Sequence, residues 1–161
     1  MLKKLLTMLT LLALLALAAC GGSSSKPSDA GQPEAASAAS GDIPDNQAFL
    51  TYKGPGYSLK YPEGWTKSGT GTNLTFGDKD NTIHLVTSTG APPIPVKGGR
   101  GKVTIHRLGK PNPVTGKRPN LIIDRYVYTK NGKVAVLDLA TPKGVDNVDA
   151  YRLISKSFRW Q

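Results

Sequence analysis

Apolar and polar residues alternate along most of the chain from Phe49 onward, and this alternation restricts the fold more than any other feature. Residues 57–61 (YSLKY) place two tyrosines and a leucine on one side and a serine and a lysine on the other, and residues 73–76 and 83–86 repeat the pattern. A period of two is typical of β-strands that bury one face. The sequence therefore predicts a series of strands that share an apolar face.

A β-hairpin is predicted over residues 121–139. Residues 121–129 (LIIDRYVYT) and 134–139 (VAVLDL) are rich in β-branched and aromatic side chains, which favour strands. Asn131 and Gly132 lie between the two runs, and both residue types tolerate the positive φ angles of a two-residue type I′ turn. We expect the two strands to be adjacent and antiparallel.

One helix is predicted near the C-terminal end of the sequence. Asp146 is a suitable N-cap, Asp149 places a negative charge in the first turn, and Lys156 places a positive charge in the last. Apolar residues recur at helical spacing from Val148 to Phe158, and residues 157–161 (SFRWQ) follow as a short strand. Hairpin-linked strands and one late helix predict an α+β fold in which a helix covers one face of an antiparallel sheet.

Residues 1–19 have the layout of a lipoprotein signal peptide. Lys3 and Lys4 form a positive region, residues 5–17 are almost entirely apolar, and small residues precede Cys20. The apolar run is shorter than the roughly 20 residues of a membrane-spanning helix. Residues 17–20 (LAAC) match the bacterial lipobox, in which the cysteine is acylated after cleavage. We expect Cys20 to be the lipid attachment site, with palmitate-type anchoring at the extracytoplasmic face of a cell membrane; the alternative is an ordinary secretory signal with an incidental cysteine.

The mature chain divides into a linker and a domain. Residues 20–48 are rich in Gly, Ser, Ala and Pro and contain no aromatic residue, a composition that buries too little apolar surface to fold. A flexible segment of this length reaches about 30 Å on average. We expect a linker over residues 20–48 and one folded domain over residues 49–161.

The mature chain is basic, and the excess of positive charge is concentrated. Loss of Lys3 and Lys4 lowers the count of Lys and Arg from 21 to 19, against 11 Asp and Glu. Between Lys97 and Lys133, Asp124 is the only acidic residue. Because an exported protein rarely meets nucleic acid, the expected partners are the membrane, an anionic envelope polymer or an acidic protein. The alternative is that these cations are solvated and keep strand edges from pairing.

Residues 110–119 predict a stiff basic loop. Its prolines restrict the backbone, so the loop loses little entropy when it binds an anionic surface. A rigid connector between strands is the alternative interpretation. The predicted partner-binding residues are Arg100, Lys110, Lys117 and Arg118.

Catalytic and metal-binding motifs are weak. His84 and His106 lie on alternating segments without a cluster of metal ligands around them, and the sequence 78–81 (DKDN) lacks the glycine and distal glutamate of a calcium loop. We therefore predict no metal, no cofactor and no enzymatic activity. An enzyme that uses Asp78, Asp80 or His84 is a less favoured hypothesis, because it requires a cleft that joins these residues.

A carrier for a small ligand is the main alternative function. Four aromatic side chains would then line a pocket together with convergent polar groups, whereas close packing of the four would oppose this function. They are Tyr57, Tyr61, Trp65 and Trp160.

Three segments resemble domains of the PsbP family, which is named after an extrinsic protein of the photosystem II oxygen-evolving complex. They are residues 57–65 (YSLKYPEGW), 111–128 (PNPVTGKRPNLIIDRYVY) and 149–160 (DAYRLISKSFRW). The resemblance covers residues 49–161 and extends to PsbP-like lipoproteins of actinobacteria. It implies an α/β/α sandwich around an antiparallel sheet, used for docking onto other proteins without catalysis. No metal-binding motif of that family is matched here.

The chain departs from this family in one segment. PsbP-like domains usually carry a helix after the third strand, but residues 87–102 (TSTGAPPIPVKGGRGK) contain three prolines and four glycines, which oppose a helix. We therefore predict that the middle helix is missing and that the sandwich is open on one face. The resulting hypothesis is a lipid-anchored, extracytoplasmic, non-catalytic domain that binds or scaffolds an envelope partner.

Overall fold

The computed structural model describes residues 41–161 of the chain. The predicted signal peptide, the lipid attachment site Cys20 and the linker up to residue 40 lie outside the described residues. Among residues 41–161, no helix has the length and apolar character needed to cross a membrane.

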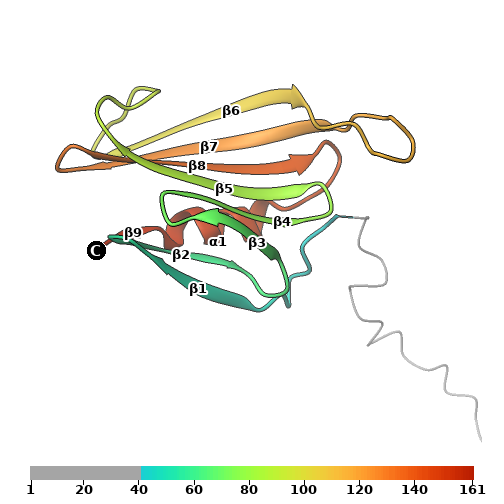
Figure 1. Ribbon diagram of the computed structural model, residues 1–161, viewed down its shortest axis with the longest axis horizontal. Helices are drawn as coiled ribbons and strands as arrows, with labels where there is room; N and C mark the ends of the chain where they lie inside the picture. The colour runs from blue at the N-terminus through green and yellow to red at the C-terminus, as the bar shows by residue number, and fades with distance from the viewer. Residues whose placement is uncertain (1–40) are drawn as a thin grey trace, which may run out of the picture. The chain divides into compact units, whose positions relative to one another are not determined.

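The larger of two sheets has six antiparallel strands in the order β3-β4-β5-β8-β7-β6 (Figure 1). Strand β8 lies between β5 and β7, so β5 and β6 do not pair although they are consecutive in the sequence. The strands are β3 Thr66–Thr70, β4 Asn73–Asp78, β5 Asn81–Thr89, β6 Arg100–Leu108, β7 Asn120–Lys130 and β8 Lys133–Pro142.

The predicted hairpin is formed by β7 and β8. The two strands pair antiparallel from Leu121 opposite Pro142 to Lys130 opposite Lys133. The turn residues Asn131 and Gly132 have φ angles of 49° and 72°, the left-handed conformation that a type I′ turn requires at both positions. This prediction is confirmed.

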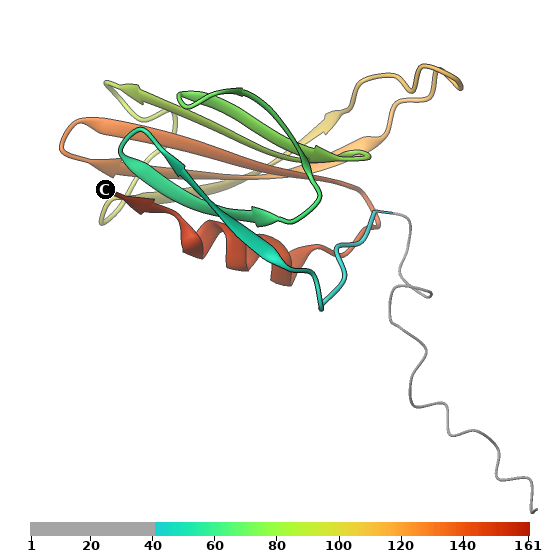
Figure 2. The ribbon, with the colours of Figure 1, turned by 60° about the horizontal axis from the view of Figure 1, so that its bottom comes forward.

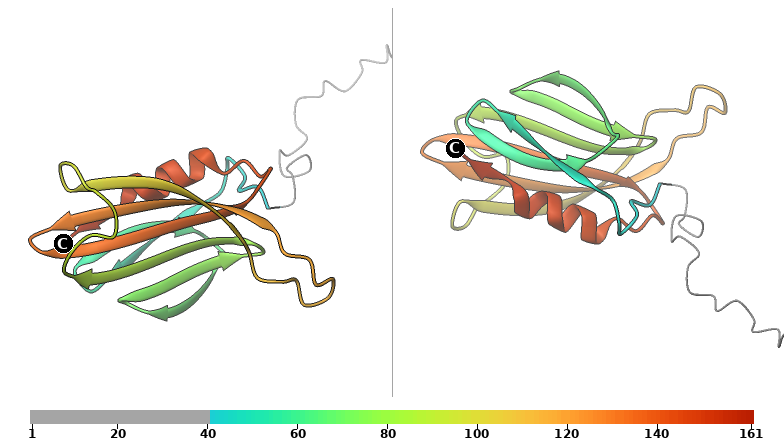
Figure 3. Two further views of the ribbon diagram at one scale, coloured as in Figure 1. Left: turned by 90° about the horizontal axis from the view of Figure 1, so that it is seen from above. Right: turned by 90° about the horizontal axis from the view of Figure 1, so that it is seen from below.

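A second layer covers one face of the six-stranded sheet (Figure 2). It consists of a three-stranded antiparallel sheet, with the order β1-β2-β9, and the helix α1. Their bounds are β1 Phe49–Gly54, β2 Tyr57–Pro62, α1 Val148–Ser157 and β9 Arg159–Trp160. Within residues 41–161 the opposite face of the large sheet carries no helix (Figure 3, left). The α+β fold without a middle helix is therefore the one that the sequence predicts.

The connection between β5 and β6 covers only a small part of the sheet face on which the middle helix is missing. Residues 90–99 fold back so that Ile94 and Val96 lie close to Gly101, where a Cβ atom would be 3.2 Å from each of them. Gly101 pairs with Val127, which is fully buried. Further along β6 the sheet is open, and Val103 remains 37% exposed.

The core lies between the two layers and is rich in aromatic rings. The side chain of Phe158 stacks on Tyr128 with ring centroids 4.3 Å apart and on Tyr57 at 5.9 Å, and Trp160 meets it edge-on at 5.2 Å. Leucines and isoleucines that alternate along β4, β5 and β8 complete the layer: Leu74, Ile83, Leu85, Leu137 and Leu139.

Replacement of Phe158 by alanine is expected to destabilise the domain by about 3–5 kcal/mol, because the change removes a buried ring and leaves a cavity between the layers. Urea unfolding measures this loss. On the same C-terminal segment, Leu153→Ala is the matched control, since Leu153 is 39% exposed and its truncation is expected to change the stability by less than about 0.5 kcal/mol. Equal effects of the two changes would show that Phe158 is not a core residue.

A buried polar cluster fixes the start of the domain against the start of α1. The amide of Asn147 donates to Thr141 Oγ1 at 2.9 Å and to Asn81 Oδ1 at 3.1 Å, and its Oδ1 accepts the backbone N–H of Ile43 at 2.7 Å. Asn81 in turn donates to the carbonyl of Gly41 at 2.5 Å. Residues 41–43 therefore pack on the domain, and the folded part begins before the predicted boundary at residue 49 because these hydrogen bonds hold it.

The same cluster shifts the helix boundary by one residue from the prediction. Asn147 rather than Asp146 occupies the N-cap position, and its side chain is directed into the buried cluster instead of capping the helix. Asp146 still contributes, since its Oδ1 accepts the N–H of Val148 at 3.2 Å. Asp149 and Lys156 lie in the first and last turns as predicted.

Alkaline pH is expected to unfold the domain because three phenols are buried. Burial, followed by the charge of Tyr52, raises the pKa of Tyr57 from 10.0 to about 12. Burial likewise raises the pKa of Tyr128 and of Tyr151. A pKa that is higher in the folded state stabilises the fold fully below pH 10, the unfolded value, and this stability is lost as the pH rises through 12. Tyrosinate absorbance and circular dichroism should therefore change together above pH 10, and full ionisation of all tyrosines in a folded domain would contradict the burial.

Candidate docking surface

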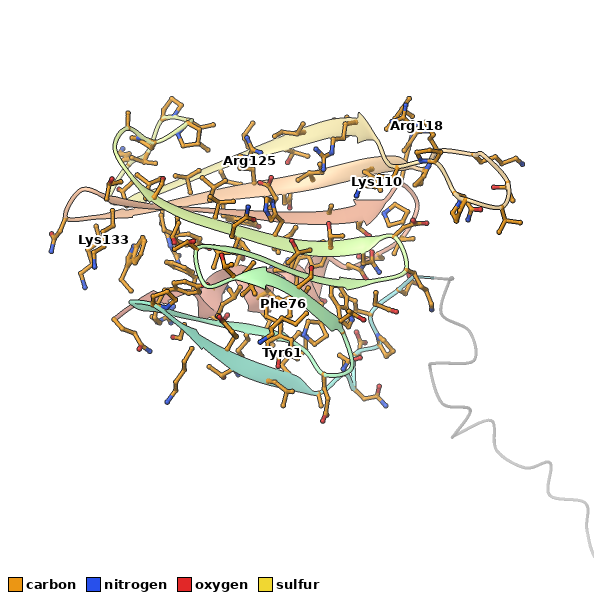
Figure 4. The ribbon with its side chains drawn as sticks, in the orientation of Figure 1. Tyr61, Phe76, Lys110, Arg118, Arg125 and Lys133 are labelled. Carbon is orange, nitrogen blue, oxygen red and sulfur yellow. The ribbon has the colours of Figure 1, made fainter. Side chains whose placement is uncertain are left out.

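The turns of the fold gather at two opposite ends, because each antiparallel strand reverses the direction of the chain. At one end, which we call the distal end, lie the β1–β2 turn, residues 90–99, the β7–β8 turn and β9. Backbone hydrogen bonds join them: Gly90 N–H donates to Gly132, Thr129 N–H to Gly99, and Gln161 N–H to Gly56. Lys133 also lies here, with Nζ 3.7 Å from the position of a Cβ on Gly56 (Figure 4).

The other end, which we call the entry end, is where the described chain enters the domain at Gly41. Gly41 accepts the hydrogen bond of Asn81 at the β4–β5 turn, and Lys143 N–H donates to Asn120 at the base of the loop 109–119. The β2–β3 turn is also here, since Glu63 N–H donates to Ala48. The loop 109–119 and the point of entry therefore lie at the same end of the domain (Figure 1).

Charge is distributed unequally between these ends. The distal end holds six basic side chains, all exposed, and no Asp or Glu among the residues that the structure describes. We call this set the distal basic surface: Lys53, Lys97, Arg100, Lys130, Lys133 and Arg159. The acidic side chains of residues 41–161 lie at the entry end, at the start of α1 or in the middle of the large sheet, where Asp124 and Asp138 form ion pairs with Lys102 and Arg125.

A groove of about 360 Å³ continues the distal basic surface along α1. Tyr126 and Tyr128 of β7 form part of its wall, with Arg100 and Lys102 on the β6 side and Arg152 and Lys156 on the helix side. The Arg100 guanidinium lies 5.2 Å from the centroid of the Tyr128 ring, and Lys102 Nζ lies 5.2 Å from that of Tyr126. Tyrosine rings below cations hold the positive charges in place without neutralising them.

Two cations of the groove have no carboxylate partner among residues 41–161. Lys102 is 2.8 Å from Asp124, and this hydrogen bond raises its pKa, while Arg152 is 2.6 Å from Asp149. Arg100 and Lys156 form no such pair in the described part of the chain. The groove therefore offers uncompensated positive charge beside an aromatic wall, which suits a carboxylate or another anion.

The four predicted partner-binding residues are divided between the two ends. Arg100 belongs to the distal basic surface, whereas Lys110, Lys117 and Arg118 lie on the loop 109–119 at the entry end (Figure 4). The nine residues of β6 that separate them span about 30 Å. Arg118 also has a structural role, since its Nε donates to the Gly109 carbonyl at 2.8 Å and closes the neck of the loop.

The loop 109–119 is held in shape by its own hydrogen bonds. Asn112 Oδ1 accepts the N–H groups of Val114 and Thr115, both at 2.9 Å, and Asn112 N–H donates to the Lys117 carbonyl at 2.8 Å. Val114 is 90% exposed at the tip. These contacts agree with the stiffness that the prolines predict, and they present Lys110 and Lys117 to solvent.

The aromatic residues proposed for a ligand carrier belong to the core or pack against it. Tyr57 is fully buried and donates to the Gly71 carbonyl at 2.7 Å, and Tyr61 stacks on Phe76 with centroids 4.0 Å apart (Figure 4). Trp160 packs against Phe158. None of the four lines the groove beside α1. Their packing opposes a carrier function.

The residues considered for catalysis lie on a surface turn and on strands of the large sheet. Asp78 and Asp80 are exposed around the tight turn between β4 and β5, and the His84 Nε2 atom is 2.8 Å from Asn73 Oδ1 in the neighbouring strand. His106 is exposed on β6. Across residues 41–161, no three His, Cys, Asp or Glu side chains are grouped to hold a metal ion.

Several residues of the surface were missed by sequence reasoning. The basic stretch from Lys97 to Lys133 is visible in the sequence, but Lys53 and Arg159 lie outside it and join the distal end through the β1–β2 and β2–β9 pairings. Arg152 and Lys156 join it across the groove. A signal was present at Lys156, which lies in the last turn of α1 where the helix dipole favours cations.

Comparison with known proteins gives similarities to solved structures but none at the level of families or curated sequences. No family model matches the chain, and no curated protein matches it. The structure is similar to the solution structure of cyanobacterial PsbP (CyanoP) from Synechocystis sp. PCC 6803, with 16% sequence identity and a TM-score of 0.43 over 71% of this chain and 94% of that chain. This is the family that the sequence motifs resemble. At this identity the similarity concerns the fold alone, and the function rests on the residues of this chain.

Proposed function

We propose that the chain is a lipid-anchored, extracytoplasmic docking domain that binds an acidic envelope partner and carries out no catalysis. The observation that supports this most is the separation of charge, with a distal basic surface that contains no acidic side chain within residues 41–161. Such a patch attracts anionic partners and accelerates their association. The groove beside α1 adds Lys156, which like Arg100 has no carboxylate partner among residues 41–161.

A second set of cations lies at the other end of the domain. The chain enters the domain at the end opposite to the distal basic surface. Lys110, Lys117 and Arg118 lie at the entry end, and we propose them as auxiliary contacts to anionic headgroups.

Binding to native envelope fractions at increasing salt tests the proposal. The mature chain from residue 20, carrying Cys20→Ala to keep it free of lipid, should bind these fractions at low ionic strength. The binding should weaken steeply as salt shortens the Debye length from about 30 Å at 0.01 M to about 8 Å at 0.15 M. Binding that does not change with salt, or no binding at any salt concentration, would show that the distal basic surface is not an electrostatic docking site.

A further inference from the structure

The outer edge of the six-stranded sheet at β6 has unpaired backbone groups. Strand β6 pairs only with β7, and two hydrogen bonds fix which of its residues face that partner: Thr129 N–H donates to Gly99, and Gly109 N–H donates to Pro119. Both bonds lie in the register of the β6–β7 pairing, in which Arg100 is opposite Tyr128. Because hydrogen-bonded and non-hydrogen-bonded pairs alternate in antiparallel sheets, the odd-numbered residues of β6 bond to β7.

The even-numbered residues of β6 therefore direct their N–H and C=O groups away from the sheet. Arg100 agrees with this assignment, because its N–H and C=O both bond to Lys97 in the preceding turn. Along the rest of β6, no hydrogen bond within residues 41–161 involves the outward N–H and C=O groups of the next four even-numbered residues. They are Lys102, Thr104, His106 and Leu108.

The two faces beside this edge differ in chemistry. Residues opposite each other in register share a face, so the even-numbered side chains lie on the side of Tyr126 and Tyr128, which is the side of the groove. Lys102 and Thr104 both contact Asp124 there. The odd-numbered side chains Val103, Ile105 and Arg107 lie on the open face, where Val103 is 37% exposed. At its start the edge thus has the cations Arg100 and Lys102 on the groove side and the apolar Val103 and Ile105 on the open face, while Arg107 and Leu108 end the strand.

We infer that β6 is the site at which an extended acidic segment of the partner protein adds as a seventh strand. This inference rests on the proposed docking function and names the chemistry of the partner. The segment would carry carboxylates at alternate positions, directed to the groove with Arg100, Lys102 and Lys156, and apolar residues between them, directed to Val103 and Ile105. An added strand takes its affinity from main-chain hydrogen bonds and its specificity from alternate side chains.

Charge and geometry favour this occupant over others. A second copy of the chain would place Arg100, Lys102 and Arg107 against the same cations, and like charges across a strand pair are destabilising. An anionic polymer without a peptide backbone would leave the alternating N–H and C=O groups unpaired. The other edge of the sheet is less suitable, because β3 has only 5 residues and is distorted at Gly69, whose φ is 87°.

Two peptides and two variants at one position test the inference. The peptides have nine residues, the length of β6, and the same content of Glu and Val, in one case alternating and in the other in two blocks. The variants are Thr104→Pro, which removes an outward N–H from an edge position where proline is tolerated, and Thr104→Ala, which keeps it. Both variants lose the hydroxyl bond to Asp124, so their difference reports the backbone alone.

The mature chain carrying Cys20→Ala is expected to bind the alternating peptide about tenfold more tightly than the block peptide, and Thr104→Pro should weaken this binding about tenfold more than Thr104→Ala does. Equal binding of both peptides with no loss in Thr104→Pro would overturn strand addition and leave electrostatic docking intact. If neither peptide binds while binding to envelope fractions stays sensitive to salt, strand addition is likewise overturned and electrostatic docking is left intact. Loss of envelope binding altogether would overturn the proposed function and this inference together.

Discussion

Replacement of Cys20 by alanine is expected to move the protein almost completely from the membrane fraction to the soluble fraction and to abolish its labelling with palmitate. The chain contains one cysteine, so no second thiol can take the lipid. Each buried methylene contributes about 0.8 kcal/mol to membrane attachment, and two acyl chains hold a protein stably where one does not. Fractionation of labelled cells measures both effects at once.

The nearby change Ser24→Ala is the matched control, because it alters the same segment without removing the thiol. It should leave both the palmitate label and the membrane fraction unchanged. A Cys20→Ala protein that still sediments with membranes and still carries label would contradict the lipoprotein interpretation. Retention in the membrane fraction without label would instead indicate an uncleaved signal segment as the anchor.

Reversal of three charges at the distal end is expected to weaken binding to the acidic partner by about 100-fold or more. The variant combines Lys97→Glu, Lys130→Glu and Lys133→Glu, all of them exposed. Each basic residue near an anionic surface contributes about 1 kcal/mol, and about 1.4 kcal/mol corresponds to a tenfold change in affinity. Titration of envelope fractions at low salt measures the loss, and urea unfolding checks that the fold is retained.

The matched control reverses the same number of charges at the entry end, with Lys110→Glu, Lys117→Glu and Lys143→Glu. Both variants have the same net charge, so a difference between them reports the position of the surface and not the charge of the molecule. The account predicts that the entry-end variant keeps most of its affinity for the partner. An equal loss in both variants would mean that the attraction is general, and a larger loss at the entry end would transfer docking to the loop 109–119.

Much of the fold could be predicted because it depends on short-range patterns. The alternation of Leu74 and Phe76 predicts a strand with one buried face, and Asn131-Gly132 predicts the turn between β7 and β8. The absence of a helix over residues 87–102 follows from proline and glycine alone. Each of these features depends on residues that are neighbours in the sequence.

The docking surface could be predicted only in part, because it depends on which ends of the strands meet. Arg100 was identified within a basic stretch, but that stretch also contains Lys110 and Lys117, which the topology carries to the other end of β6. Strand β8 lies between β5 and β7, an order that no local pattern specifies. The packing of α1 then brings Lys156 beside Arg100 across the groove.

The start of the domain shows the same limit. Residues 41–48 have the composition of a linker, and only Ile43 indicates burial. Their position is fixed by Asn147, whose Oδ1 accepts the backbone N–H of Ile43 in the buried cluster. The two residues are 104 positions apart in the sequence. A contact between residues so far apart leaves no periodic pattern in the sequence. The composition of residues 41–48 therefore predicted a linker where the structure has a packed segment.

The central claim is that the partner binds at the distal basic surface, and hydrogen exchange of the amides with and without the partner tests it most directly. The mature chain carrying Cys20→Ala would be compared free and bound to envelope fractions at low salt. The account predicts slower exchange in residues 97–102, in the β7–β8 turn and at the end of α1, with little change in the loop 109–119. Protection of that loop alone, or unchanged exchange at the distal end in a bound protein, would contradict it.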